Sequence, residues 1–258
     1  MMDKLAKRLP EFKLAAKLSR LAYLHSRDAR ELEELQARAV QKSVLHIFES
    51  RESGTQGVVF IDHSAKAIYI AYCGTQNLQD WGTNLRVCKK PMGKIHIHRG
   101  VRYAIRTVRD RVMLAVHSYL DYRIYLTGHS LGGMCAQAAC AWLEDRFKRT
   151  KDITLITFGA GMIASTNDIN DAIHSPHYRF QNGSDAVPRR PALPIFYGHP
   201  TCPNHCHIYF PNSVKELGLY LFDPDTLTIW RDRLFTLGER VTDHDIRDYE
   251  AKLDEVIV

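Results

Sequence analysis

The stretch that decides the fold is residues 125–134, YLTGHSLGGM. It continues a short apolar run, places Ser130 between Gly128 and Gly132 in the order G-x-S-x-G, and leads into an apolar helical pattern. A strand, this motif and a helix form the context in which a strained turn presents a nucleophilic serine. Side chains at the two glycines would collide with the neighbouring strand or helix. We therefore predict that Ser130 is a nucleophile, with a structural turn of small residues as the alternative.

Outward from this turn, short strands alternate with amphipathic helices. Two strands joined by a turn at 63–66 are predicted within 57–74, and further strands over 123–127, 153–159, 178–182 and 225–231. Helices are predicted over 11–23, 27–40, 99–119, 131–147 and 243–253. This alternation predicts one α/β domain over residues 1–258, with a mostly parallel central sheet and helices on both faces. Active groups gather at the carboxyl ends of strands in such sheets, where Ser130 lies.

Composition indicates a globular protein. The chain has 258 residues, 45% of them hydrophobic and 25% charged, and no apolar run approaches the ~20 residues needed to span a bilayer. Charges occur throughout the first 20 residues, so no secretory signal is predicted. Six cysteines are too few for a disulfide framework, and together with the lack of a recognisable signal they predict a cytoplasmic location, with export or a removed signal as the alternative. The C-x3-C spacing of Cys202 and Cys206 is outside the usual zinc pattern, so no metal is expected.

The charge surplus of the chain is +6, and residues 1–20 carry six basic residues against two acidic ones. A solvated helix face is the favoured interpretation of this basic N-terminal helix. Docking on an anionic membrane surface is the alternative. We find no recognisable nucleic-acid module, so nucleic acid is not expected as a partner. The sequence does not indicate an oligomeric state.

Several segments together resemble one family. LTGHSLGG, then LITFG, then RFQNGSDAVPRRP, is similar to the class 3 lipase family, the fungal-type triacylglycerol lipases and their relatives. Upstream, KLAAKLSRLAYL, AYCGTQNLQDWGTNL and IHIHRGV resemble segments of that family in the same order, so the resemblance covers roughly residues 13–254. It implies an α/β-hydrolase fold and a serine-dependent lipase or esterase that acts on lipid or small carboxylic esters without a cofactor.

The resemblance also implies a catalytic triad of Ser130, Asp185 as the acid and His244 as the base. The sequence supports Asp185 independently, because it follows a predicted strand in a glycine-containing turn; a turn-capping aspartate is the alternative. His244 lies in a polar loop before the last predicted helix, and the chain order Ser, Asp, His is the one this fold uses. His199 and His207 are the rival bases.

An oxyanion hole is implied as well, made of the backbone N–H groups of Thr75 and Leu131. The Thr75 hydroxyl would assist, held by Asn84. The chain departs from the family at Cys73, where the family often has arginine, which leaves the fine substrate preference open.

The segment where a lid is expected, residues 82–94, is short and mostly polar, and Pro91 and Gly93 interrupt any helix. A lid that opens at an oil surface should be an amphipathic helix. We therefore predict a weak or absent lid, little interfacial activation and a preference for shorter, more soluble esters. Phospholipase activity, another acyl-transfer reaction and a catalytically inactive lipid-binding protein of the same fold remain alternatives.

Overall fold

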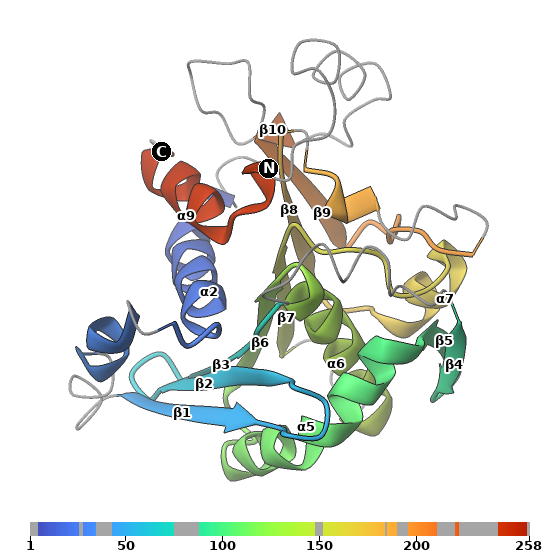
Figure 1. The fold of residues 1–258 in the computed structure, drawn as a ribbon, viewed down its shortest axis with the longest axis horizontal. Helices are drawn as coiled ribbons and strands as arrows, with labels where there is room; N and C mark the ends of the chain where they lie inside the picture. Colours follow the sequence, from blue (N-terminus) through green and yellow to red (C-terminus); the bar gives the residue numbers. More distant parts are fainter. Residues whose placement is uncertain are drawn as a thin grey trace.

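A computed structural model describes residues 5–25, 28–34, 43–74, 88–147, 152–183, 185–189, 196–210, 220–221 and 242–256. Its centre is an eight-stranded sheet in the order β1-β2-β3-β6-β7-β8-β9-β10 (Figure 1). These strands are β1 (Ser43–Glu49), β2 (Gln56–Asp62), β3 (Ala67–Tyr72), β6 (Arg123–His129), β7 (Ile153–Phe158), β8 (His177–Asn182), β9 (His205–Phe210) and β10 (Tyr220–Leu221). A separate hairpin pairs β4 (Lys89–Met92) with β5 (Ile95–His98).

The middle of the sheet is parallel. Strands β3, β6, β7, β8 and β9 pair in parallel, whereas β1-β2-β3 form an antiparallel meander and β10 pairs antiparallel with β9. Every residue of β3 and six of the seven residues of β6 are buried, as expected for parallel strands covered on both faces. The prediction of a mostly parallel sheet is confirmed.

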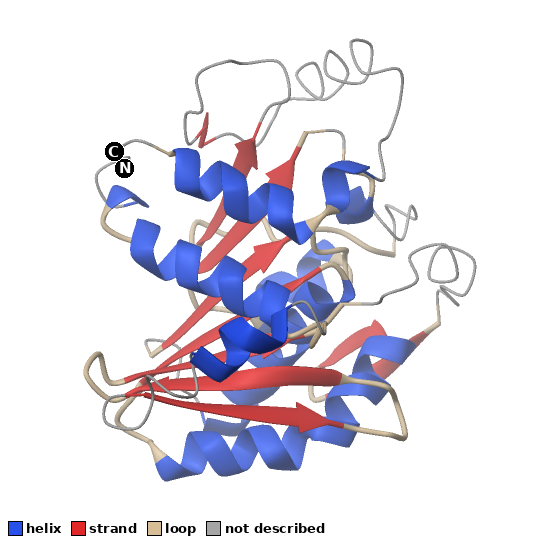
Figure 2. Ribbon diagram, turned by 60° about the vertical axis from the view of Figure 1, so that its left-hand side comes forward, coloured by secondary structure: helices blue, strands red, loops and turns tan. Residues whose placement is uncertain are grey.

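Helices cover both faces of this sheet (Figure 2). On one face lie α2 (Leu9–Leu21) and α9 (Ile246–Glu255), and on the other lie α5 (Arg99–Ser118), α6 (Leu131–Phe147) and α7 (Thr166–Ala172). Because strand side chains alternate, Ile68 and Ile70 of β3 join the core under α5 and α6, while Tyr69 and Ala71 join the core under α2 and α9. None of the described helices is long and apolar enough to cross a membrane.

The basic residues of the N-terminal helix are engaged in ion pairs. The basic side chains of α2 and of its N-cap residue lie within 4 Å of carboxylates. The ion pairs are Arg8–Glu11, Lys13–Asp254, Lys17–Glu31, Arg20–Asp28, Arg20–Glu31 and Arg20–Glu250. Two of these carboxylates belong to α9, which packs beside α2. The helix is therefore an integral part of one face of the fold.

Most predicted elements form within one to three residues of their expected ends. The second predicted helix is described only over residues 28–34, and the strand expected at 225–231 lies outside the described residues. The sequence prediction omitted β1, β4, β9, β10 and α7. In β9 the apolar residues Cys206, Ile208 and Phe210 alternate with other side chains, but the strand is short and only its last three residues are buried.

Candidate active site

Ser130 forms the whole turn between β6 and α6, because β6 ends at His129 and α6 begins at Leu131. Its φ of +59° lies in the left-handed region, which costs a residue with a side chain about 1–2 kcal/mol. The turn is held on both sides: the Ser130 N–H donates to the carbonyl of Phe158 on β7 at 3.0 Å, and the Ser130 carbonyl accepts from the Met134 N–H at 3.2 Å. Surrounding structure therefore holds this strained turn in place.

The two glycines of the motif are required by close packing. A Cβ atom at Gly128 would overlap the backbone of Gly132 at the start of α6. A Cβ atom at Gly132 would overlap the carbonyl oxygen of Tyr72 on β3. The expected reason for both glycines, a collision with the neighbouring helix or strand, therefore applies here.

Asp185 follows β8 and accepts three hydrogen bonds. Its Oδ2 accepts from His244 Nδ1 at 2.8 Å and from the Tyr249 hydroxyl at 2.7 Å, and its Oδ1 accepts from the Val187 N–H at 2.9 Å. A buried carboxylate needs such donors, and both Asp185 and His244 are at most 1% exposed. Because His244 donates from Nδ1, its Nε2 is left as a proton acceptor in the neutral ring.

Ser130 lies at the same edge of the sheet as this pair. Gly159, directly after β7, has a φ of +55°, and a Cβ atom there would lie 2.7 Å from Asp185 Oδ2 and 3.0 Å from the His244 ring. The His244 ring is 4.4 Å from the ring of His129, the neighbour of Ser130. The carboxyl ends of β6, β7 and β8 thus bring the three predicted residues to one place.

Two atoms at this place are buried and have no hydrogen-bond partner among the described residues: Ser130 Oγ and His244 Nε2. Ser130 is fully buried, so bulk water does not solvate its hydroxyl. In such an environment electrostatic interactions are stronger than in water. A proton donor and a proton acceptor therefore remain available in one dry location.

The rival bases do not contact Asp185. His199 Nε2 is 2.5 Å from the carbonyl of Pro188, and His207 faces Arg179 across the β8–β9 pairing. Burial, and then the charge of Arg179, lower the pKa of His207 to about 2. Of the three candidate bases, only His244 is hydrogen-bonded to the predicted acid.

Tyr249 is a residue that the sequence analysis missed. Its hydroxyl donates to Asp185 and accepts from the backbone N–H of Asn182 at 3.0 Å, so it joins α9 to the end of β8. Burial, and then the Asp185 carboxylate, raise the pKa of Tyr249 well above its usual range, which keeps it a donor. The available signal was its place on the buried stripe of α9 with Ile246 and Leu253, where a tyrosine hydroxyl needs a polar partner.

A second tyrosine lies behind the turn. The Tyr23 hydroxyl is 2.7 Å from His129 Nδ1, and burial, followed by the proximity of His244, lowers the pKa of His129 well below its usual range. His129 therefore stays neutral and supports the His244 ring from the side.

The predicted oxyanion hole is described only in part. Leu131 is the first residue of α6, and first-turn amides of a helix have no partner within the helix. Thr75 and Asn84 lie outside the described residues. Gly74, the residue before Thr75, is in close contact with the turn, because a Cβ atom on it would lie 3.2 Å from Ser130 Cβ.

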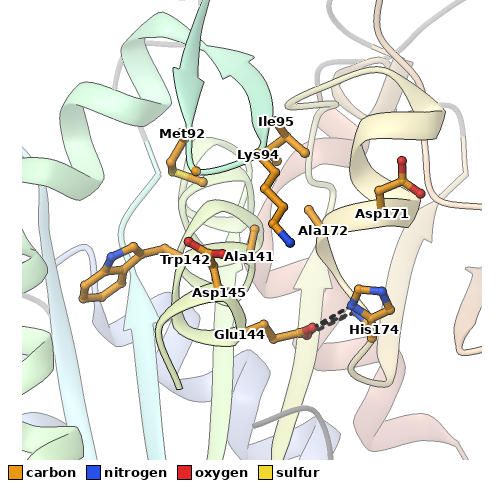
Figure 3. Close-up of a pocket in the computed structure, with 11 residues that line it drawn as sticks. Met92, Lys94, Ile95, Ala141, Trp142, Glu144, Asp145, Asp171, Ala172 and His174 are labelled. Atoms are coloured by element: carbon orange, nitrogen blue, oxygen red, sulfur yellow. Dashed lines mark hydrogen bonds and ion pairs between the residues drawn. The ribbon is translucent and has the colours of Figure 1, made fainter. Parts of the chain in front are cut away.

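A cavity of about 280 Å³ lies elsewhere, between the β4–β5 hairpin, the end of α6 and the end of α7 (Figure 3). Its lining includes Lys94, Trp142, Asp145 and His174. Residues 141–145 follow Ser130 along α6 by roughly 11 to 15 residues, or roughly 16–22 Å by the helical rise. The cavity is therefore separate from Ser130.

No group of three His, Cys, Asp or Glu side chains in the described part of the chain is arranged to hold a metal ion. Cys202 and Cys206 are not bridged by a disulfide.

Comparison with known proteins identifies related lipases. Residues 69–194 match the family Lipase (class 3), a span that includes Ser130 and Asp185 and ends before His244. A secreted mono- and diacylglycerol lipase of Fusarium solani is 28% identical over 57% of this chain and 46% of its own length. Lipase A of Penicillium cyclopium, also named a secreted mono- and diacylglycerol lipase, is 23% identical over 58% of this chain and 52% of its own length. The chain thus spans about half the length of the curated relatives it matches.

Solved structures show the same fold. A triacylglycerol lipase whose catalytic centre is formed by a serine protease triad superposes with a TM-score of 0.71 at 19% identity, over 92% of this chain and 93% of that chain. At this identity the likeness establishes the fold, so the expected α/β-hydrolase fold is confirmed.

The comparisons correct one expectation, the location, and support another, the family. The predicted cytoplasmic location is wrong, because the relatives from Fusarium solani and Penicillium cyclopium are named as secreted proteins and indicate an extracellular location. The matched family model and the relatives support the assignment of the chain to the class 3 lipase family, and the solved structures show the shared fold.

Proposed function

We propose that this chain is a serine-dependent carboxylic ester hydrolase with Ser130 as nucleophile, His244 as general base and Asp185 as the orienting acid. The observation that carries the proposal is the buried Asp185–His244 hydrogen bond beside a strained serine. Beside it, Ser130 Oγ and His244 Nε2 are buried and have no hydrogen-bond partner among the described residues. This is the constellation that an activated nucleophile requires.

The reaction proceeds in two acyl-transfer steps. His244 Nε2 takes the Ser130 proton as Oγ attacks the ester carbonyl, and then returns that proton to the leaving alcohol. Asp185 stabilises the imidazolium through Nδ1, and Tyr249 holds the carboxylate in place. Water then attacks the acyl-enzyme with His244 again as the base. We place the oxyanion at the Leu131 and Thr75 N–H groups, with Asn84 supporting Thr75; removal of such a donor typically costs about 10²–10³ in turnover.

For the substrate we propose esters of fatty acids and small carboxylic esters. The relatives are named as lipases of mono- and diacylglycerols, and the structural neighbour as a triacylglycerol lipase, which supports a lipid ester. The segment where a lid was expected, residues 82–94, lies partly outside the described residues, which begin again at residue 88. In the described part of this segment, residues 89–92 form β4. We keep the preference for shorter esters as a prediction from the sequence.

We also propose that residues 1–258 act as one domain, since one sheet joins described elements from β1 to β10. Docking of the basic N-terminal helix on a membrane stays a prediction of the sequence. Its ion pairs with carboxylates reduce the charge that α2 offers to such a surface.

The test is labelling with a fluorophosphonate and turnover of p-nitrophenyl esters from acetate to palmitate, beside matched thioesters and amides. We expect Ser130→Ala to abolish labelling, and Ser130→Ala and His244→Ala each to lower ester turnover by at least about 10³-fold. Ser118→Ala and His117→Ala, two exposed changes on α5, are the matched controls and should leave turnover unchanged. Wild-type protein that neither labels nor turns over any ester would leave a lipid-binding protein of this fold.

A further inference from the structure

One surface of the protein carries an unusual concentration of positive charge. Residues 88–109 contain seven lysine and arginine residues and no aspartate or glutamate, whereas the whole chain has a surplus of only six. The seven are Lys89, Lys90, Lys94, Arg99, Arg102, Arg106 and Arg109. They occupy the β4–β5 hairpin and the first three turns of α5, which follow directly on one another.

The structure joins these two elements into one surface. The Arg99 N–H donates to the carbonyl of Cys88, just before β4, at 2.9 Å, and Arg102 Nε donates to the carbonyl of Pro91 in β4 at 2.6 Å. Four of the five arginines of α5, Arg99, Arg102, Arg106 and Arg109, follow one another at intervals of three or four residues, so they lie along one side of the helix, beside its buried stripe. We call the surface of Lys89, Lys90, Arg99, Arg102 and Arg106 the basic face.

This arrangement opposes the local stability of α5. Like charges three or four residues apart on a helix repel one another. The first turn of α5 contains no acidic residue, although the positive end of a helix dipole favours one, and Arg99 is the first residue there. Local rules of this kind are broken most often where a residue serves a function.

The basic face lies at the edge of the sheet where Ser130 is. Helix α5 leads into the start of β6, so it runs opposite to the parallel strands and begins at their carboxyl edge. At that point the His98 N–H donates to the carbonyl of Ile163, in the segment that follows β7. Figure 1 shows the hairpin and the start of α5 side by side at this flank. A surface that contacts the basic face therefore also lies near the entrance side of the proposed active site.

An exposed aromatic residue is the chain neighbour of a tyrosine that contacts one of these cations. Phe196 is 57% exposed, and its neighbour Tyr197 is buried against the hairpin, with Lys89 Nζ 5.2 Å from the centre of the Tyr197 ring. Aromatic side chains beside lysine and arginine are typical of proteins that sit in the headgroup region of a bilayer. This combination favours a lipid surface over a nucleic acid.

We propose that the basic face, with Phe196, docks the protein on a bilayer that contains anionic lipid and turns the Ser130 edge of the sheet toward it. The proposal rests on the proposed function only for its purpose, the delivery of lipid esters to Ser130. The docking itself depends on charge and is measured without turnover.

The test is sedimentation with vesicles of phosphatidylcholine alone and of phosphatidylcholine with about 30% phosphatidylglycerol, in a series of salt concentrations. The test variant is Lys90→Gln/Arg99→Gln/Arg106→Gln. These three side chains are exposed, and no carboxylate of the described residues lies within 4 Å of them in an ion pair. The control variant is Lys66→Gln/Arg123→Gln/Arg146→Gln, which removes the same charge from exposed positions at the amino edge of the sheet.

We expect wild type and the control to bind the anionic vesicles alike, and the test variant to bind at least about ten-fold more weakly. Binding of the wild type should fall as salt rises and be weak on phosphatidylcholine alone. Equal losses in the two variants, no wild-type binding, or tighter binding of the wild type to duplex DNA than to the vesicles would each overturn the proposal.

A turnover assay separates this proposal from the proposed function. The test variant should hydrolyse a water-soluble ester at the wild-type rate, because none of its three positions contacts the Asp185–His244 pair. Docking without any ester turnover in the wild type would refute the proposed function and leave the docking intact. Ester turnover with no charge-dependent docking would refute only the docking.

Discussion

Replacing Tyr249 with phenylalanine tests whether the third donor to Asp185 serves the reaction. The change removes one O–H, which donates to Asp185 Oδ2 at 2.7 Å and accepts from the Asn182 N–H at 3.0 Å, both in the fully buried interior. A hydrogen bond to a charged group contributes about 1.5–3 kcal/mol, and a buried N–H left without an acceptor costs about 1–3 kcal/mol. We expect the free energy of unfolding to fall by about 2–4 kcal/mol.

The effect on turnover follows from the same bond. If the whole 1.5–3 kcal/mol acts in the transition state, kcat falls about ten- to hundred-fold.

Tyr125→Phe is the matched control. The Tyr125 hydroxyl also donates to a carboxylate, that of Glu11, at 2.7 Å. Tyr125 is buried and lies on β6, before the turn at Ser130. We expect urea titration to show a comparable loss of stability in the two variants, with kcat lowered only in Tyr249→Phe. Wild-type kcat in Tyr249→Phe, or an equal loss of kcat in Tyr125→Phe, would refute the role assigned to Tyr249.

Three further predictions follow from the described geometry. Gly159→Ala should lower kcat on p-nitrophenyl butyrate by at least about 100-fold. The new methyl group would lie 2.7 Å from Asp185 Oδ2, and residue 159 has a left-handed φ. Near-normal turnover would contradict this prediction. Gly132→Ala should leave little folded protein by circular dichroism, since its Cβ overlaps the Tyr72 carbonyl. His207 has a pKa of about 2 and is therefore neutral in the fold, whereas a histidine of the unfolded chain titrates at pH ~6.5. The free energy of unfolding should therefore contain the whole contribution of His207 above about pH 6.5 and should lose it, by up to about 1.4 kcal/mol per pH unit, as the pH falls. His207→Gln should remove about one proton from that slope in thermal unfolding; an unchanged slope would contradict it.

The turn at Ser130 could be predicted from sequence because its causes are local. An apolar strand, two glycines and a helical pattern lie within 20 residues of one another, and the collisions that require the glycines come from the adjoining backbone. The contact between Asp185 and His244 spans 59 residues. Chain order and family resemblance selected these two residues, but no local pattern indicates their distance.

What the sequence did not reveal depends on partners far away in the chain. The cations of the N-terminal helix were expected to face solvent, yet Arg20 is bound by Glu250, 230 residues later. Tyr249 was missed because only the assembled sheet brings Asp185 to its hydroxyl. In β9, which was also missed, His205 is bound by residues that are distant in the chain: its Nδ1 contacts His177 Nδ1 at 3.2 Å, and its Nε2 contacts the Ile173 carbonyl at 3.1 Å.

The pairing of α2 with α9 has a kinetic consequence. Contacts between residues so distant in the chain carry a large loop-closure cost, so they form slowly compared with local turns. The turn at Ser130 is built from neighbouring residues, whereas His244 takes its place only when α9 docks against α2 and the end of β8. In a refolding experiment, protection of the β6–α6 amides should therefore appear before hydrolytic activity returns. The nucleophile would be in position while its base is still missing, so the protein would acquire its shape before its reactivity.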